Sequence, residues 1–130
     1  MPWRIQTLAE TRLPLLEVCY EGLLTGADLF DAGRASMAAL LKQERPRMLA
    51  DCTALEGGHS IFDLYELADA IMASGLAPTL REAILTPTLP MPAETVRFWE
   101  TMCFNRGIQV RIFTDRQRAL EWLSESPSRP

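Results

Sequence analysis

Apolar residues recur along this chain with two different periods, which divide it into strands and helices. Residues 4–10 alternate partly and residues 13–21 are rich in β-forming side chains, so the pattern predicts an N-terminal β-hairpin. Further strands are predicted at 47–52, 81–86 and 108–113. The first two of these are short apolar runs, which are typical of strands buried on both faces of a parallel sheet.

Helical periodicity fills the segments between the later strands. Helix starts are predicted at Thr25, Ser60 and Thr114, because each is followed three positions on by a residue that can complete a capping box. A further helix is predicted to have Pro92 in its first turn, where a missing N–H is tolerated. Gly75 stands where a helix-ending glycine belongs.

The order of elements is therefore β-β-α-β-α-β-α-β-α. Strands alternating with helices predict an α/β fold, with a mostly parallel four- to five-stranded sheet, an N-terminal β-hairpin and four helices. We expect the three later strands to be parallel neighbours. Residues 1–123 are expected to form a single domain, and residues 124–130 a flexible polar tail.

Composition narrows the function classes. The 130 residues are 48% hydrophobic and 23% charged, as in an ordinary globular protein, and the net charge of −4 without a basic cluster disfavours a nucleic-acid partner. No apolar run approaches the length of a membrane span. Three widely spaced cysteines and one histidine predict free thiols, a cytoplasmic location and no metal. No cofactor-binding sequence is present, so no cofactor is expected.

Polar residues after the strand at 47–52 form the candidate ligand or switch loop. These residues are Asp51, Thr53, His59 and Ser60, and they are expected at the carboxyl edge of the sheet, where ligands bind in open α/β folds. Ser60 has two interpretations. It either caps the helix that follows, or carries a phosphate that the helix N-terminus would stabilise.

Cys52 and His59 are the one pair that suggests an enzyme. A nucleophilic cysteine needs a lowered pKa and an aligned base, and no third orienting residue is evident here. A lone cysteine at a strand end belongs more often to the core. We therefore expect a protein that is not an enzyme, with this pair as the alternative.

Several apolar side chains fall outside the predicted inward faces of the helices. They are Phe62, Phe98 and Phe104, together with the alanines of the first helix. Clustered exposure of this kind marks a partner or lipid surface. We expect a protein partner and a homodimer, with at least one of Phe98 and Phe104 buried in the dimer contact.

Three segments carry a family resemblance that spans about residues 3–123. EGLLTGADL, LADCTALEG and VRIFTDRQRALEWL resemble the SpoIIAA-like group of STAS domains (sulfate transporter and anti-sigma-factor antagonist), especially the small stand-alone members described with the CRAL-TRIO lipid-binding fold. The resemblance implies a SpoIIAA-like fold and a non-enzymatic regulatory or protein-interaction module. The alternative it implies is a small apolar-ligand or lipid-binding protein.

The resemblance also gives Ser60 its second interpretation. In signalling members of the family, a strand ending in Asp leads to a phosphorylatable Ser within a D-S-S-G sequence. Asp51 and Ser60 occupy roughly those places, but GHSIFD stands where the D-S-S-G would be.

Overall fold

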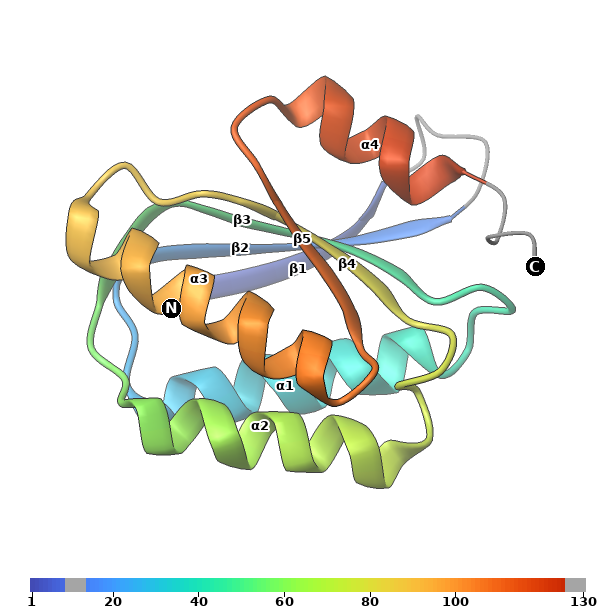
Figure 1. Ribbon diagram of the computed structural model, residues 1–130, viewed down its shortest axis with the longest axis horizontal. Coiled ribbons are helices and arrows are strands. Elements are labelled where there is room, and N and C mark those ends of the chain that lie inside the picture. The colour runs from blue at the N-terminus through green and yellow to red at the C-terminus, as the bar shows by residue number, and fades with distance from the viewer. Residues whose placement is uncertain (9–13, 126–130) are drawn as a thin grey trace.

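The computed structural model describes residues 1–8 and 14–125. The elements follow the predicted order (Figure 1): β1 Trp3–Leu8, β2 Leu15–Leu23, α1 Gly26–Leu40, β3 Arg47–Gly57, α2 Ile61–Ser74, β4 Arg81–Leu85, α3 Pro90–Asn105, β5 Gln109–Phe113 and α4 Arg116–Ser124. The α/β fold class is therefore confirmed. The predicted turn between the first two strands, and residues 126–130 of the predicted tail, lie outside the described residues.

The five strands form one sheet in the order β1-β2-β3-β4-β5. β1 pairs with β2 antiparallel, which confirms the hairpin at the sheet edge. The other neighbours are parallel, with Ala50 opposite Ile84 and Ile84 opposite Ile112. The expectation that the three later strands are parallel neighbours is therefore confirmed. The alternation of strands and helices in the sequence made this prediction possible, because two parallel neighbouring strands need a crossover connection, which is usually a helix.

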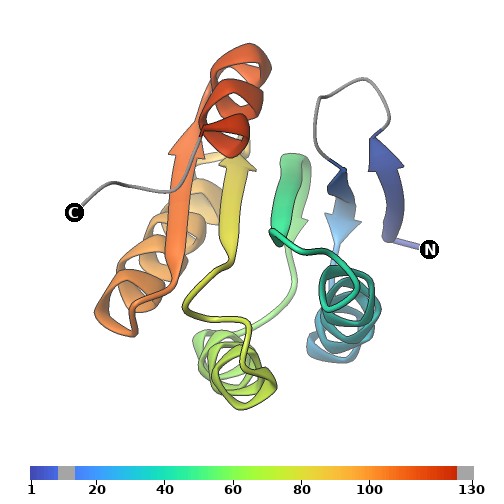
Figure 2. The ribbon, with the colours of Figure 1, turned by 90° about the vertical axis from the view of Figure 1, so that its right-hand side faces the viewer.

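The helices are distributed unequally over the two faces of the sheet. α1, α2 and α3 cover one face and α4 lies on the other (Figures 1 and 2). The larger core lies under α1–α3, while a smaller one joins Ala119 and Leu123 of α4 to residues of β1–β4. On the α4 face, the main sheet contacts of that helix are with β3, β4 and β5. Polar side chains of β1 and β2 on that face therefore need other partners.

β3 is longer than predicted. It continues to Gly57, so Thr53 lies on a strand and not in a loop. The reason is that β2 also runs on to Leu23 and pairs with β3 beyond Asp51, across a register shift after Cys19. A single strand's hydrophobic pattern does not reveal how far its neighbour extends.

Three of the four predicted helix starts are confirmed and one was displaced. Thr25 and Ser60 each cap a helix with both hydrogen bonds of a capping box. The prediction for Thr114 was wrong, because the side chain of Asp115 is the one that accepts from the backbone of Gln117. α3 starts at Pro90, so Pro92 is the third helical residue and lies in the first turn, as predicted.

The alanines of α1 were assigned outside the core, which holds for the exposed Ala38 but not for Ala32 and Ala39. Ala32 is fully buried, and Ala39 packs against the larger core. Close approach of the helices explains this, because a Cβ added at Gly33 would lie 2.8 Å from the Leu67 side chain of α2. Small residues on α1 therefore serve the α1–α2 contact.

Arginines hold the C-terminal end of α4 against the sheet. The Nε of Arg47 donates to the carbonyl of Leu123 at 3.2 Å, and an Nη of Arg81 donates to the carbonyl of Trp122 at 3.1 Å. Burial, followed by repulsion from Arg81, lowers the pKa of Arg47 to about 10. These cations donate to carbonyls in the last turn of the helix, where the helix dipole favours positive charge.

None of the helices in the described part of the chain combines the length and the apolar character that crossing a membrane requires.

Candidate functional site

The predicted loop residues separate onto the two faces of the sheet. Asp51 faces the α4 side, where its Oδ1 accepts from the backbone N–H of Thr53 at 3.0 Å and from the Thr53 hydroxyl at 2.7 Å. His59 instead lines a cavity beneath α1–α3. The structure therefore does not bring Asp51 and His59 into one site.

Ser60 is the N-cap of α2, and its side chain accepts one hydrogen bond from the helix backbone. Its Oγ accepts from the backbone N–H of Asp63 at 3.1 Å, and the Asp63 carboxylate accepts from the Ser60 backbone N–H at 2.8 Å. The hydroxyl is exposed. This geometry is that of a structural cap, and Asp63 already supplies negative charge at the helix N-terminus.

An apolar cavity lies between the sheet and helices α1–α3. It has a volume of about 80 Å³, and apolar side chains from every covering helix line it. The lining residues are Tyr20, Leu24, Leu29, Gly33, Ser36, Met37, Leu40, Met48, Ala50, Cys52, Leu55, His59, Leu64, Leu67, Ile71, Leu80, Glu82, Ile84, Thr95, Val96 and Trp99. An engineered apolar cavity of about 150 Å³ binds benzene, so this volume suits a ligand of roughly three to five heavy atoms.

Glu82 is the charged group of this cavity. It lies on β4 and is 6% exposed, and the indole N–H of Trp99 donates to its Oε1 at 2.9 Å. Burial raises the pKa of Glu82 to about 7, and the Trp99 hydrogen bond offsets only part of that rise. Sequence reasoning missed this residue. The signal available was an acidic side chain inside the apolar run REAIL.

Two further polar atoms of the cavity lack hydrogen-bond partners. The Ser36 hydroxyl and the Nδ1 of His59 are buried without one. Burial is the main cause that lowers the pKa of His59. Buried polar groups are normally satisfied, so unpartnered ones in a cavity mark places where a bound molecule or water would be held.

The proposed nucleophile pair does not have the features of a reactive thiol. Cys52 is buried, and desolvation raises the pKa of its thiol well above the ordinary value, with Glu82 raising it further. No hydrogen bond joins Cys52 to His59 within the described residues. A raised pKa reduces the thiolate that a nucleophile requires. Cys52 and His59 are therefore interpreted as lining residues of the cavity and not as a nucleophile and its base.

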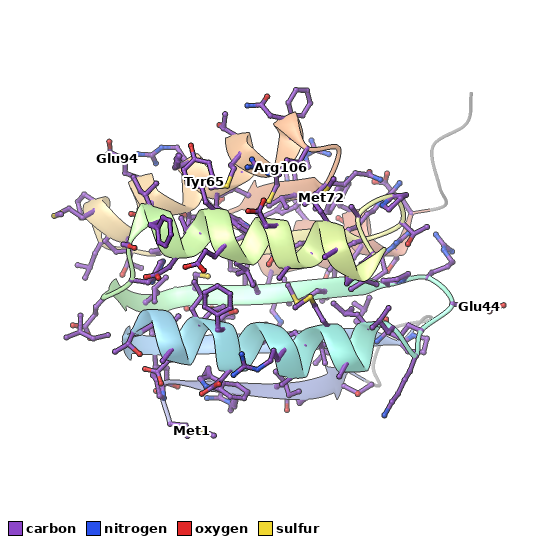
Figure 3. All side chains as sticks on the ribbon, turned by 90° about the horizontal axis from the view of Figure 1, so that it is seen from below. Met1, Glu44, Tyr65, Met72, Glu94 and Arg106 are labelled. Carbon is purple, nitrogen blue, oxygen red and sulfur yellow. The ribbon has the colours of Figure 1, made fainter. Side chains whose placement is uncertain are left out.

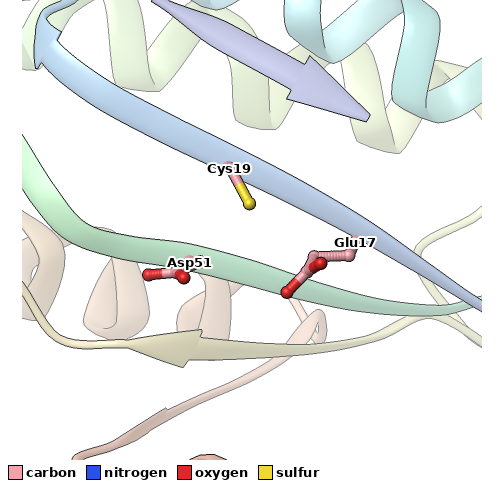
Figure 4. A group of neighbouring side chains, drawn as sticks. All are labelled: Glu17, Cys19 and Asp51. Atoms are coloured by element: carbon pink, nitrogen blue, oxygen red, sulfur yellow. The ribbon is translucent and has the colours of Figure 1, made fainter. Parts of the chain in front are cut away.

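A second polar group lies on the opposite face of the sheet. Glu17, Cys19 and Asp51 place one ligand atom each within 4.8 Å of one another (Figure 4). However, one Glu17 oxygen accepts from Gln6 at 2.5 Å and the other pairs with Arg116 at 2.7 Å. Burial, and then the Glu17 charge, raise the pKa of the Cys19 thiol. Arg116 thus occupies the place that a cation would take.

The three predicted interface phenylalanines have different environments. Phe98 packs against the larger core and meets Tyr65 edge-on, with ring centroids 5.9 Å apart. Phe98 is therefore half-buried and not wholly outside the core as predicted, because Tyr65 of the neighbouring helix covers part of it. Phe62 and Phe104 remain 69% and 79% exposed. α2 and α3 run in the same direction in Figure 1, so Phe62 and Phe104 lie at opposite ends of the helical layer.

Other exposed apolar side chains lie on the side of α2 that faces α3 and at the carboxyl edge of the sheet. Tyr65 and Met72 project from α2 toward α3 (Figure 3), and the Arg106 guanidinium lies 5.4 Å from the Tyr65 ring centroid. At the carboxyl edge, large apolar side chains flank the starts of α1, α2 and α3. These carboxyl-edge residues are Leu23, Ile61, Phe62, Leu89 and Met91.

Comparison with known proteins identifies a similar fold. No protein-family model matches the sequence, and no curated protein matches it. Among solved structures, a protein of the DUF3478 family from Shewanella loihica PV-4, described as uncharacterized and as having a SpoIIAA-like fold, is similar with a TM-score of 0.63. The identity is 21%, and the match covers 93% of each chain. The chain therefore has a SpoIIAA-like fold, which confirms at the level of fold the resemblance drawn from its sequence.

Proposed function

We propose that this protein is a non-enzymatic STAS-like module that binds a small, mainly apolar molecule between its sheet and its three-helix layer. The observation that carries the proposal is the cavity of about 80 Å³ lined by α1, α2, α3 and β2–β4. Closely packed cores leave few voids larger than a water molecule. An apolar cavity that also holds unpartnered polar atoms has the usual composition of a small-molecule site.

A ligand in the cavity would contact α2, a helix that also has exposed apolar side chains on the protein surface. Leu64, Leu67 and Ile71 of α2 line the cavity, while Phe62 and Met72 of the same helix are exposed. A bound ligand would contact the side of α2 that lines the cavity, and a protein partner would contact the exposed side of the same helix. This arrangement supports a regulatory role in which binding alters a surface.

The second candidate function is protein contact without a ligand. It is favoured by the carboxyl-edge residues, among which Phe62 is 69% and Met91 81% exposed. Exposed apolar side chains concentrated in one region are typical of interaction surfaces. This candidate needs no occupied cavity.

Native mass spectrometry of the purified protein, with two variants, separates the candidates. Ala50→Leu fills the cavity, since Ala50 lines it and is 2% exposed. Phe62→Ser changes only the exposed edge. A ligand-binding module loses a small-molecule adduct in Ala50→Leu and keeps it in Phe62→Ser. A protein-contact module gives the opposite result, with a co-purified protein partner lost in Phe62→Ser and retained in Ala50→Leu.

A further inference from the structure

The charges that line the cavity restrict which small molecules it can take. Glu82 is the only acid among the lining residues, and the lining contains no lysine or arginine. His59 is the remaining basic group, and burial lowers its pKa. A bound carboxylate or phosphate would therefore meet Glu82 without a cation to neutralise it. The lining disfavours anionic ligands, fatty acids among them.

Glu82 itself lacks a counter-charge. Its one hydrogen bond within the described part of the chain is the Trp99 indole N–H to Oε1, and none of the ion pairs formed there includes it. Desolvation makes the ionised carboxylate costly, and this burial raises its pKa to about 7. Two events relieve that cost, namely protonation of the carboxyl or arrival of a cation.

Other lining groups complement a cation or an N–H donor. Trp99 and Tyr20 provide aromatic rings, whose faces attract ammonium groups. The unpartnered Ser36 hydroxyl can accept a hydrogen bond from a second N–H. A metal ion is a poorer fit, because Cys52, His59 and Glu82 do not form a metal-ligating cluster in the described residues.

We propose that the cavity binds a small organic ammonium compound, with a hydrocarbon part of a few carbons and its ammonium group paired with the Glu82 carboxylate. This inference rests on the proposed function and specifies its ligand class. The cavity of about 80 Å³ limits the ligand to roughly the size of a propylamine.

The test compares n-propylamine, 1-propanol and propionate by NMR titration at pH 8, following the methyl groups of the lining residues Ile71 and Ile84. The three compounds share a short chain and differ in charge. We expect propylamine to bind at least tenfold more tightly than 1-propanol, and propionate not to bind. Equal affinity of propylamine and 1-propanol, or binding of propionate, overturns the ammonium inference and leaves the ligand-binding function standing. Failure of all three to bind overturns both.

Glu82→Gln removes the charge and keeps the shape, and it should abolish the preference for propylamine over 1-propanol. Glu17→Gln is the matched control, because Glu17 is also buried but lies on the opposite face of the sheet. If Glu82→Gln keeps the preference, Glu82 is not the counter-ion and the inference fails.

A pH series on the wild-type protein gives a test that needs no variant. With a pKa of about 7, the ionised fraction of Glu82 falls about tenfold from pH 8 to pH 6, so propylamine affinity should fall by about that factor. The titratable groups that face Glu82 are Tyr20 on β2, Cys52 on β3 and Cys103 on α3. The pKa of each is raised, so all three stay neutral between pH 6 and pH 8. The affinity for the uncharged 1-propanol is the control, because a change in the protonation of His59 would alter it as well. Propylamine affinity that is constant between pH 8 and pH 6 contradicts the proposal.

Discussion

At the scale of single residues, Ser60 shows how a family resemblance and local geometry can point in different directions. The resemblance makes this serine a candidate for phosphorylation, whereas both hydrogen bonds of the capping box assign it to the start of α2. Ser60→Ala should lower the free energy of unfolding by about 1 kcal/mol, and Ser60→Asp should leave it nearly unchanged, because Asp caps about as well as Ser. Urea denaturation measures both. Thr25→Ala and Thr25→Asp at the equivalent cap of α1 should behave alike. A Ser60→Asp variant of unaltered stability that no longer binds a partner would instead identify a switch.

Glu82 is a second single residue with a testable effect, because its ionisation should make the stability of the protein depend on pH. Its pKa is raised from 4.5 to about 7 in the folded protein, so the folded state binds the proton more tightly than the unfolded chain. Stability from this group is therefore greatest below the unfolded pKa and falls as the pH rises from about 4.5 through about 7. The full difference is about 3 kcal/mol. Glu82→Gln should flatten this decline and be the more stable protein at pH 8, as measured by urea denaturation at pH 5 and pH 8. A variant that loses stability in parallel with the wild type would contradict this assignment.

At the scale of elements, the attachment of α4 depends on buried cations. Arg47→Met removes donors from the carbonyls of Leu123 and Thr79, which lie 3.2 Å from its Nε and 2.9 Å from its Nη1. The expected cost is about 1–3 kcal/mol in the free energy of unfolding, with faster hydrogen exchange concentrated in α4. Arg34→Met is the control, since Arg34 is exposed and its ion pair in the described part of the chain is with Asp31 on its own helix. Uniform acceleration of exchange over all elements would show that the arginine does not act on α4 specifically.

Elements were the scale at which sequence reasoning succeeded best. Periodicity placed every strand and helix of the described chain, because a period of 2 or 3.6 is a local property. It could not place Thr53 on β3, since that depends on the extension of β2. It also missed Phe98, which is covered by Tyr65 of another helix. The cavity was missed for a related reason: it is a gap between elements, and its charged residue, Glu82, is separated along the chain from His59 and Ser36.

At the scale of the whole molecule, self-association remains a prediction. Phe98 packs within one subunit, so Phe104, 79% exposed near the end of α3, is the remaining candidate for a homodimer contact. Sedimentation velocity at high protein concentration should show a dimer for the wild type and more monomer for Phe104→Ser. Phe62→Ser, at the other end of the helical layer, is the matched control. A wild type that stays monomeric at all concentrations would contradict this prediction.

The central claim is that the cavity between the sheet and α1–α3 takes up a small molecule. Methyl NMR of the isoleucines during a 1-propanol titration tests it most directly, because Ile71 and Ile84 line the cavity whereas Ile61 is exposed at the carboxyl edge and Ile112 lies outside the lining. We expect saturable shifts of the Ile71 and Ile84 methyl signals in the wild type, and no such shifts in Ala50→Leu. Shifts confined to Ile61, or equal shifts in both proteins, would show that no small molecule enters the cavity.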